Sequence, residues 1–392
     1  MSALRGVRVL DLSRVMSGPY CTAMLADLSA EVIKIETPGS GDDARRFGPF
    51  VNGESVYFAL LNRSKKSVAL NLKHAKAREL AQRLAAQSDV VVENFRPGVA
   101  RRLGLDYATL NAQNARIVYL SISGFGQEGP FAGRPAYDLI VQAMSGIMSI
   151  TGQSDGEPTA VGESLADVAT GMFGAFAIMS ALYERERSGC GTHIDLAMFD
   201  SLLAMQLTAL SRLWASGQAP ARVGNRHPVT APVDTFRARD GLVAMVVPGD
   251  AQFSKLCEVI GRPELAEDER FKTNPARAKH EPQLKRAIEE WMGTRTVREC
   301  LGIFGEADIP TGPVWDLQQA VTSEHAVARG LVSEIKHPVF GSVGMIGQPA
   351  RFSHAGSAPS PEPRLGEHTL DVLRGLGVQE SELETLKREG AI

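Results

Sequence analysis

Short apolar runs alternate with amphipathic segments over the first 200 residues of the chain. Between the apolar runs lie helical patterns such as residues 75–87, where Leu80 and Leu84 stand four apart on one face. Strands that alternate with helices predict an α/β fold with a mostly parallel sheet. The runs rich in valine, isoleucine and leucine, which we predict to be its strands, span residues 8–13, 31–36, 67–72, 90–95, 117–122 and 193–198.

The pattern changes after about residue 225. Residues 235–247 predict a hairpin that turns at Asp240-Gly241, and residues 353–368, rich in serine, proline and glycine, predict a linker before a final short helix at 369–377. Further helices are predicted at residues 253–261, 281–294 and 297–307. We therefore divide the chain into a large domain over 1–205, a smaller α+β domain over 225–310, and a return segment and tail over 311–392 that packs on the large domain.

The segment ESLADVATGMFGAFAIMSAL, residues 163–182, carries one acid near the start of an apolar helical pattern, Asp167. Aspartate is a favoured N-cap residue, and Gly189 is a candidate for the other end of the helix. Large apolar side chains such as Phe173 and Phe176 point in most directions, which predicts a buried helix whose first turn opens into the interior or a cleft. A carboxylate at a helix N-terminus is kept ionised, as a carboxylate nucleophile must be. The residues alone leave both roles open.

Composition argues against several functional classes. The net charge is −3, with no basic stripe for nucleic acid and no polybasic run for an anionic membrane surface. No uninterrupted apolar run reaches about 18 residues, so we predict no transmembrane helix, and the N-terminus lacks the apolar core of a signal peptide. These features predict a cytoplasmic protein without a membrane or nucleic-acid partner.

The cysteines are scattered and form no CxxC pair, so we predict no metal site and no disulfide framework. They are Cys21, Cys190, Cys257 and Cys300.

The sequence GFGQEG at residues 124–129 matches a dinucleotide-binding fingerprint and follows a predicted strand. That site needs a helix N-terminus directly after the glycines, where backbone amides meet the pyrophosphate. Pro130, Gly133 and Pro135 follow instead, which favours a loop. We therefore discount a nicotinamide cofactor.

Six segments, taken in their order and spacing, resemble the class III CoA-transferases, the family of formyl-CoA:oxalate and carnitine CoA-transferases. The resemblance extends over essentially the whole length. The segments are GVRVLDLSRVMSGPYCTAMLADLSAEVIKIE (6–36), NRSKKSVALNLK (62–73), VENFRPGVARRLGL (92–105), SGFGQEGP (123–130), LADVATGMFGAFAIMSALYERERSG (165–189) and IPTGPV (309–314).

This resemblance implies a Rossmann-like, CoA-binding large domain, a small domain, and an interlocked homodimer in which each chain threads its partner. It implies that Asp167 is the nucleophile and that a CoA thioester is a substrate, with no permanently bound cofactor. Basic residues on loops after strands suit the phosphates of CoA. The implied CoA contacts are Val15, Met16, Ser17, Leu70, Asn71, Leu72, Lys73, Asn94, Phe95, Arg96, Arg102 and Tyr137.

The chain departs from the formyl-CoA:oxalate transferases at three places. Thr37 replaces a basic residue, Met16 replaces a glutamine beside oxalate, and residues 247–252 replace a glycine-rich loop. These differences argue against formyl-CoA:oxalate transfer but not against the transferase class. Succinyl-CoA as donor and a small dicarboxylate as acceptor suit the family. Candidates to hold a second carboxylate are Arg14, Arg46 and Arg134, and His227 beside Asn225 is a candidate to line the acceptor pocket.

Two other functions stay open. Relatives that racemise 2-methylacyl-CoA use a histidine followed by an aspartate, and the matching pair in this chain is Tyr137-Asp138. A tyrosine with a pKa near 10 is a poor base at neutral pH, so we favour the transferase. A non-catalytic CoA-binding protein is the third hypothesis.

Overall fold

The computed structural model describes residues 3–353 and 359–392. They form two compact units. The large unit comprises residues up to 147, 160–210 and 325–392, and the second unit comprises 148–159 and 211–324. This division differs from the predicted limits in two respects. Residues 148–159, predicted in the large domain, and residues 311–324, predicted in the return segment, belong to the second unit.

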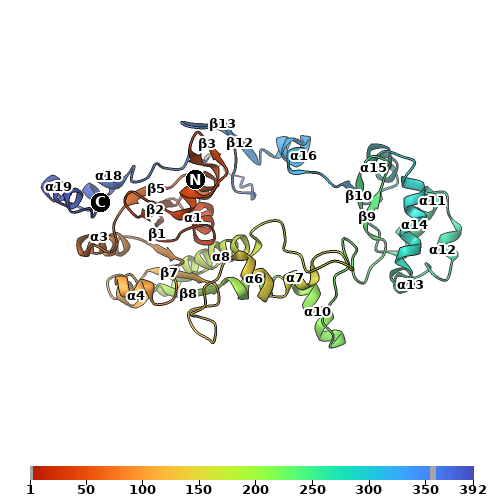
Figure 1. Cartoon of the computed structure of the whole chain (residues 1–392), viewed down its shortest axis with the longest axis horizontal. Helices are drawn as coiled ribbons and strands as arrows, with labels where there is room; N and C mark the ends of the chain where they lie inside the picture. The colour runs from red at the N-terminus through yellow and green to blue at the C-terminus, as the bar shows by residue number, and fades with distance from the viewer. Residues whose placement is uncertain (1–2, 354–358) are drawn as a thin grey trace. The chain divides into compact units, whose positions relative to one another are not determined.

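The large unit is built on one six-stranded sheet in which every strand is parallel to its neighbours (Figure 1). Its order is β5-β2-β1-β6-β7-β8, so the chain builds outward from β1 to one side and then to the other. The predicted α/β fold with a parallel sheet is confirmed. The strands are β1 (Arg8–Asp11), β2 (Glu31–Glu36), β5 (Lys66–Ala69), β6 (Val90–Glu93), β7 (Val118–Ser123) and β8 (Thr192–Ala197).

Successive residues of each strand point to opposite faces, and each face has its own apolar core. On one face, Val9 and Val90 pack with helices α1 (Ser17–Asp27) and α8 (Leu165–Ser188). On the other face, Leu10 packs with α3 (Ala75–Ala86) and with α18 (Thr369–Gly375) and α19 (Glu380–Arg388) near the C-terminus. The sheet is therefore buried between two helical layers, which explains why its strands read as continuous apolar runs.

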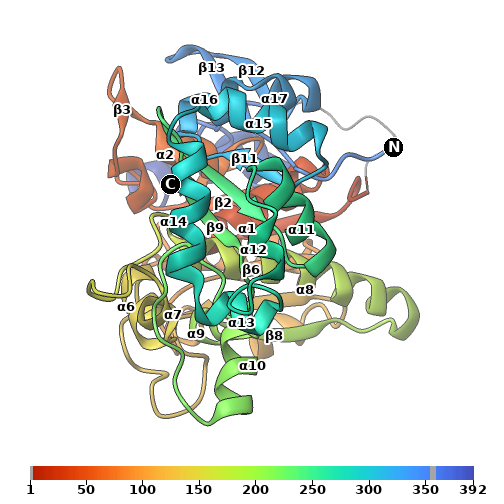
Figure 2. The same cartoon turned by 90° about the vertical axis from the view of Figure 1, so that its right-hand side faces the viewer.

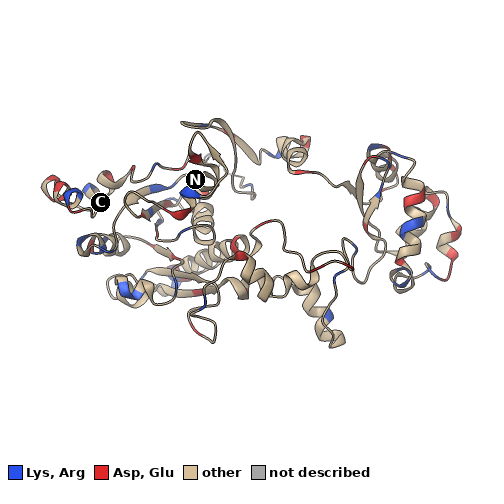
Figure 3. Cartoon of the chain, in the orientation of Figure 1, with Lys and Arg blue, Asp and Glu red and all other residues tan. Residues whose placement is uncertain are grey.

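Helix α8 contacts α1 through small residues. A Cβ atom at Gly171 would lie 2.9 Å from the carbonyl oxygen of Ser17, so the two backbones approach closely. The opposite face of α8 is exposed in the single chain, where Phe176 is 71% exposed. The prediction of an all-round buried helix was wrong, because α8 buries only one face, which includes Ile178 and Leu182, and leaves several large apolar side chains of the other face exposed. Figure 3 shows α7 (Ile147–Ile150) and much of α8 without charged residues.

At 24 residues, α8 is also long and apolar enough to pass a length-and-composition test for a membrane span, a test that core helices of soluble proteins pass too. The sequence prediction had excluded such a helix. The glycine face of α8 packs on α1 of the same chain.

The segment predicted as a linker covers the outer edge of strand β5; its residues 354–358 lie outside the described residues. The Ser64 amide donates to the Ser360 carbonyl (3.0 Å), and the His368 amide donates to the Ser67 carbonyl (2.9 Å). The Ala69 amide donates to the Thr369 hydroxyl (2.9 Å). Residues 360–369 therefore satisfy backbone groups that an open sheet edge would leave unpaired.

The second unit contains an antiparallel sheet of order β11-β10-β9, formed by β9 (Val233–Arg237), β10 (Leu242–Val246) and β11 (Thr311–Pro313). The predicted hairpin is confirmed as β9 and β10. Figure 2 labels helices of this unit, among them α11 (Asp250–Val259), α14 (Glu281–Met292) and α15 (Val297–Glu306). These helices share one apolar core with the sheet.

The remaining elements are short. In the first half they are the 3-10 helix Asp43–Arg46, β3 (Phe50–Val51), β4 (Glu54–Ser55), α2 (Val56–Asn62), α4 (Val99–Leu103), α5 (Tyr107–Asn111), α6 (Asp138–Met144) and α7 (Ile147–Ile150). In the second half they are α9 (Met198–Ala204), α10 (Leu207–Ser216), α12 (Glu264–Glu267), α13 (Asn274–Lys279), α16 (Leu317–Thr322), α17 (Glu324–Arg329), β12 (Val332–His337) and β13 (Gly341–Ile346).

Candidate active site

A cleft of about 200 Å³ lies beyond the carboxyl ends of β1, β6 and β7 in the large unit. The strand order reverses between β1 and β6: β2 and β5 follow β1 on one side of the sheet, whereas β6, β7 and β8 lie on the other side. Open α/β sheets bind ligands at such a switch point. The cleft brings together eight of the predicted site residues: Val15, Met16, Ser17, Asn94, Phe95, Arg96, Tyr137 and Asp167.

Asp167 is the third residue of α8, and Ser164 occupies the N-cap position, so the N-cap prediction for Asp167 was wrong. The neighbouring helix α6 supplies the cap. The Asp138 Oδ1 atom accepts a hydrogen bond from the Ala166 amide (2.7 Å) and a longer one from the Asp167 amide (3.4 Å). The amides at the start of α8 are thus bound by Asp138, which leaves the Asp167 carboxylate free to contact another element.

That other element is α1, which begins at Ser17. The hydroxyl and the backbone of Ser17 face the Asp167 carboxylate in the same cleft, and both lower its pKa. The N-cap residue of α1, Met16, makes no side-chain cap of its own. Asp167 therefore supplies a negative charge at the N-terminus of α1, where the helix dipole stabilises it.

Burial and the nearby charge of Asp138 raise the pKa of Asp167 to about 6, against the opposing effect of the polar groups of Ser17. A carboxyl group with this pKa is still ionised in about nine of ten molecules at pH 7. It is also more basic than an ordinary aspartate. The site thus holds a partly desolvated carboxylate anion, as nucleophilic catalysis by a carboxylate requires.

The loop before α1 is tied to the end of β6. The Arg14 amide donates to Asn94 Oδ1 (2.8 Å), and Asn94 Nδ2 donates to the Arg14 carbonyl (2.7 Å). The next residue, Val15, has a φ of 67°, a left-handed conformation that is rare for a β-branched side chain. The side-chain amide of Asn94 is therefore used to hold the loop.

Two of the three arginines considered for a second carboxylate line the cleft, Arg14 and Arg134. The Arg14 guanidinium lies 3.6 Å from Asp43, and both side chains are exposed enough to separate. Arg134 stacks over the ring of Phe131 at 4.3 Å. Arg46 pairs with Asp43 and does not line the cleft.

The cleft does not include the predicted contacts after β5, which lies two strands away from β1. Leu70 is 1% exposed, and its side chain belongs to the core. Asn71 bonds to the C-terminal segment, donating from its backbone to Ala391 and from its side chain to Gly390. Lys73 is exposed and Leu72 packs at the edge of the core. Arg102 is exposed on α4, also outside the cleft. The CoA-binding role of these residues stays a prediction.

Sequence reasoning missed two residues of the site. Asp138 was considered only as part of a racemase pair, and its contact with α8 has no local sequence signal. Tyr57, on α2, was not considered. Burial and the charge of Asp167, among other carboxylates, raise the pKa of the Tyr57 hydroxyl, which keeps it protonated as a hydrogen-bond donor.

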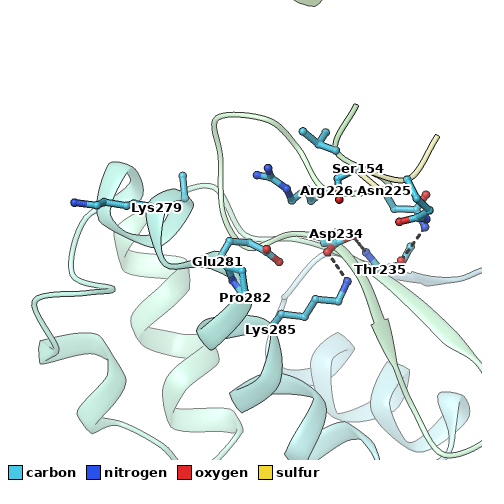
Figure 4. Close-up of a pocket in the computed structure, with 12 residues that line it drawn as sticks. Ser154, Asn225, Arg226, Asp234, Thr235, Lys279, Glu281, Pro282 and Lys285 are labelled. Atoms are coloured by element: carbon cyan, nitrogen blue, oxygen red, sulfur yellow. Dashed lines mark hydrogen bonds and ion pairs between the residues drawn. The ribbon is translucent and has the colours of Figure 1, made fainter. Parts of the chain in front are cut away.

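The second unit contains a separate polar pocket of about 480 Å³, drawn in Figure 4. The Lys285 ammonium faces Asp234 at 2.5 Å, while Lys279 points away. Asn225 lines this pocket, but His227 does not. His227 is held in a turn, where its backbone amide donates to the Val233 carbonyl (2.7 Å).

Comparisons with known proteins identify the family to which the chain belongs. The model of "CoA-transferase family III" matches residues 4–369. The acetyl-CoA:oxalate CoA-transferase of Acetobacter aceti is 46% identical over 93% of this chain and 92% of its own length. The succinyl-CoA:glutarate CoA-transferase of Mus musculus is 39% identical over 100% of this chain and 91% of its own. The crystal structure of a CAIB/BAIF family protein from Brucella suis matches with a TM-score of 0.85 and 38% identity, covering 96% of this chain and 99% of that one. The chain belongs to CoA-transferase family III and is a CoA-transferase.

Proposed function

We propose that the protein transfers CoA from a donor acyl-CoA to a small carboxylic or dicarboxylic acid, with Asp167 as the nucleophile. The observation that carries this proposal is the Asp167 carboxylate, which is ionised at neutral pH and lines the cleft beside α1. A carboxylate in this setting attacks a thioester without a general base, because it is already an anion.

The proposed reaction begins when Asp167 attacks the thioester carbonyl carbon of the donor. The carbon–sulfur bond breaks, giving a mixed anhydride and CoA thiolate. The thiolate then attacks the aspartyl carbonyl of the anhydride, which releases the donor acid and leaves an aspartyl-CoA thioester. No metal and no permanently bound cofactor takes part.

The second half of the reaction mirrors the first. The acceptor carboxylate attacks the aspartyl-CoA thioester and expels CoA thiolate, forming a second anhydride. The thiolate attacks the acceptor acyl carbon, which gives the new acyl-CoA and restores the Asp167 carboxylate. Each tetrahedral intermediate carries an oxyanion that needs hydrogen-bond donors, and water must be excluded because it would hydrolyse the anhydride.

Small dicarboxylates are the acceptors we propose, with acetyl-CoA or succinyl-CoA as donor. Relatives named for oxalate and for glutarate support this class. In this chain, Arg14 and Arg134 line the same cleft as Asp167, so a second carboxylate could pair with a guanidinium while the first reacts.

We also propose a cytoplasmic homodimer with interlocked chains and without nucleic-acid or membrane partners. Monomeric proteins rarely expose large contiguous apolar patches, and this chain exposes many large apolar side chains. A second copy would bury them. Those on α6, α8 and α10 are Leu139, Ile140, Met144, Met172, Phe173, Phe176, Tyr183, Leu207 and Trp214.

The decisive experiment traps the intermediate. The protein is incubated with donor acyl-CoA and quenched with hydroxylamine, and the modified residue is mapped by mass spectrometry. A hydroxamate at Asp167 is expected, and Asp167→Asn should abolish transfer while keeping its melting temperature. Full transfer by that variant would refute the nucleophile, and CoA affinity without covalent labelling would indicate a binding protein.

A further inference from the structure

A network of buried charges lies beneath the loop that presents Ser17 to Asp167. Lys34, in β2, and Asp42, in the loop after it, form an ion pair at 2.8 Å with both side chains fully buried. The same ammonium donates to the Ser13 carbonyl (2.8 Å). A second buried pair joins Lys65 to Asp11 at 3.0 Å. The cleft itself contains none of these four charged side chains, so they bind no substrate there.

Asp42 connects this network to the strained point of the loop. Its Oδ1 atom accepts a hydrogen bond from the Val15 amide (3.0 Å), and Val15 is the residue in the left-handed conformation. A non-glycine residue in that conformation is strained and persists only where the surroundings fix it. Asp42 fixes the amide side of Val15, while Asn94 holds the residue before it through both backbone groups of Arg14.

The direction of the chain after Val15 decides where α1 begins. Ser17 starts α1 two residues later and lines the cleft beside Asp167, where its hydroxyl and backbone face the carboxylate. A loop that relaxed from the left-handed turn would move the first turn of α1, and both groups of Ser17 would move away from Asp167 together. Asp42 therefore influences Asp167 indirectly, through Val15 and Ser17.

We propose that Asp42 is a positioning residue for CoA transfer: held by Lys34, it clamps the left-handed Val15 and so aims Ser17 at Asp167. This inference rests on the proposed role of Asp167 as nucleophile. The network supplies no reacting atom. Its function is to keep one loop in a conformation that the loop's own residues disfavour.

The test compares two buried ion pairs that differ in what they hold. Asp42→Asn removes the charge that Lys34 faces and replaces the charge-assisted hydrogen bond from the Val15 amide by a weaker, neutral one. The matched control is Asp27→Asn, because Asp27 pairs with Arg63 with both side chains about as buried, at 4% and 5% exposed, but at the far end of α1. Each variant loses a buried charge, so both should lower the melting temperature.

The readout is the pH dependence of kcat/KM for the donor acyl-CoA, alongside kcat and the melting temperature. Moving Ser17 away from Asp167 removes the effect by which Ser17 lowers the pKa of Asp167. We therefore expect the acid limb of the Asp42→Asn profile to move to higher pH and kcat to fall about 10- to 100-fold. Asp27→Asn should keep the wild-type limb and kcat. The other charged and titratable groups around Asp167, unchanged in both variants, are Asp138, Glu163, Tyr57, Arg14, Asp43, Arg96 and Arg134.

A variant that cannot fold would not answer the question, so a second one is made. Lys34→Met/Asp42→Asn leaves no unpaired charge in the core, and is measured in place of the single variant if that does not fold. It should show the same shift of the acid limb. A wild-type limb and kcat in the folded Asp42 variant would overturn the proposal, as would an equal shift in Asp27→Asn. Transfer by Asp167→Asn would instead refute the nucleophile, which keeps the two failures distinct.

Discussion

Replacing Asp138 by asparagine should lower the pKa of Asp167 and extend activity to more acidic pH. The substitution keeps an oxygen that can accept from the Ala166 amide, so the cap on α8 is retained. It removes the negative charge that, after burial, is the second cause of the raised pKa of Asp167. The new amide nitrogen would face the donating Nε2 of Gln142, which costs about 1 kcal/mol of stability for one lost hydrogen bond.

The size of the shift follows from the pKa of about 6, against an ordinary value of 3.8. This rise of roughly two units corresponds to about 3 kcal/mol. Burial is the larger cause, so the charge of Asp138 accounts for about half a unit to one unit. At pH 5 the ionised fraction of Asp167 should rise about two- to fivefold in the variant. At pH 8, where both proteins are ionised, the rate should fall modestly because a less basic carboxylate is a weaker nucleophile.

The assay measures kcat/KM for the donor acyl-CoA between about pH 4.5 and 8.5, a range chosen to span the expected pKa of Asp167. This parameter reports ionisations of the free enzyme. The control is Glu184→Gln, which removes an exposed charge near the other end of α8. Its acid limb should match that of the wild type. An acid limb that stays in place in Asp138→Asn, or moves to higher pH, would refute the electrostatic account of Asp167.

Three further predictions concern stability and assembly. Gly171→Ala should destabilise the protein by about 1–3 kcal/mol because the new Cβ would lie 2.9 Å from the Ser17 carbonyl oxygen, whereas Gly302→Ala, which meets open space, should not lower the melting temperature. Burial raises the pKa of Glu93 from 4.5 to about 7, so the native state holds a proton that the unfolded state has lost, and stability falls by up to roughly 3 kcal/mol as pH rises through this window. Glu93→Gln should remove this loss of stability, measured as the free energy of urea unfolding at about pH 5 and pH 8. An unchanged pH dependence in the variant would contradict the role of Glu93. Phe176→Asp should convert a dimeric wild type into monomers by sedimentation velocity, and a wild type that sediments as a monomer would exclude the proposed assembly.

The parallel sheet could be predicted from sequence because its strands are buried on both faces and read as unbroken apolar runs. Asp167 could be placed at the start of a helix for the same kind of reason, since the apolar pattern after it is strong. Its surroundings could not be predicted. Asp138 contacts it from a different helix, 29 residues earlier, and Ser17 faces it from 150 residues earlier. The exposed face of α8 was also misjudged, because an apolar side chain carries no sign of whether its own chain or another one covers it.

The long-range bonds along β5 bear on how the protein is made. The Ala69 amide bonds to Thr369, 300 residues later in the chain. A ribosome that has completed all strands of the large sheet has therefore not yet made the segment that seals its edge, and the second unit is synthesised in between. Nascent protein would carry an open parallel edge throughout that interval, the kind of surface on which chains misassociate. Slow translation or truncation before residue 360 should consequently increase aggregation more than loss of stability alone would explain.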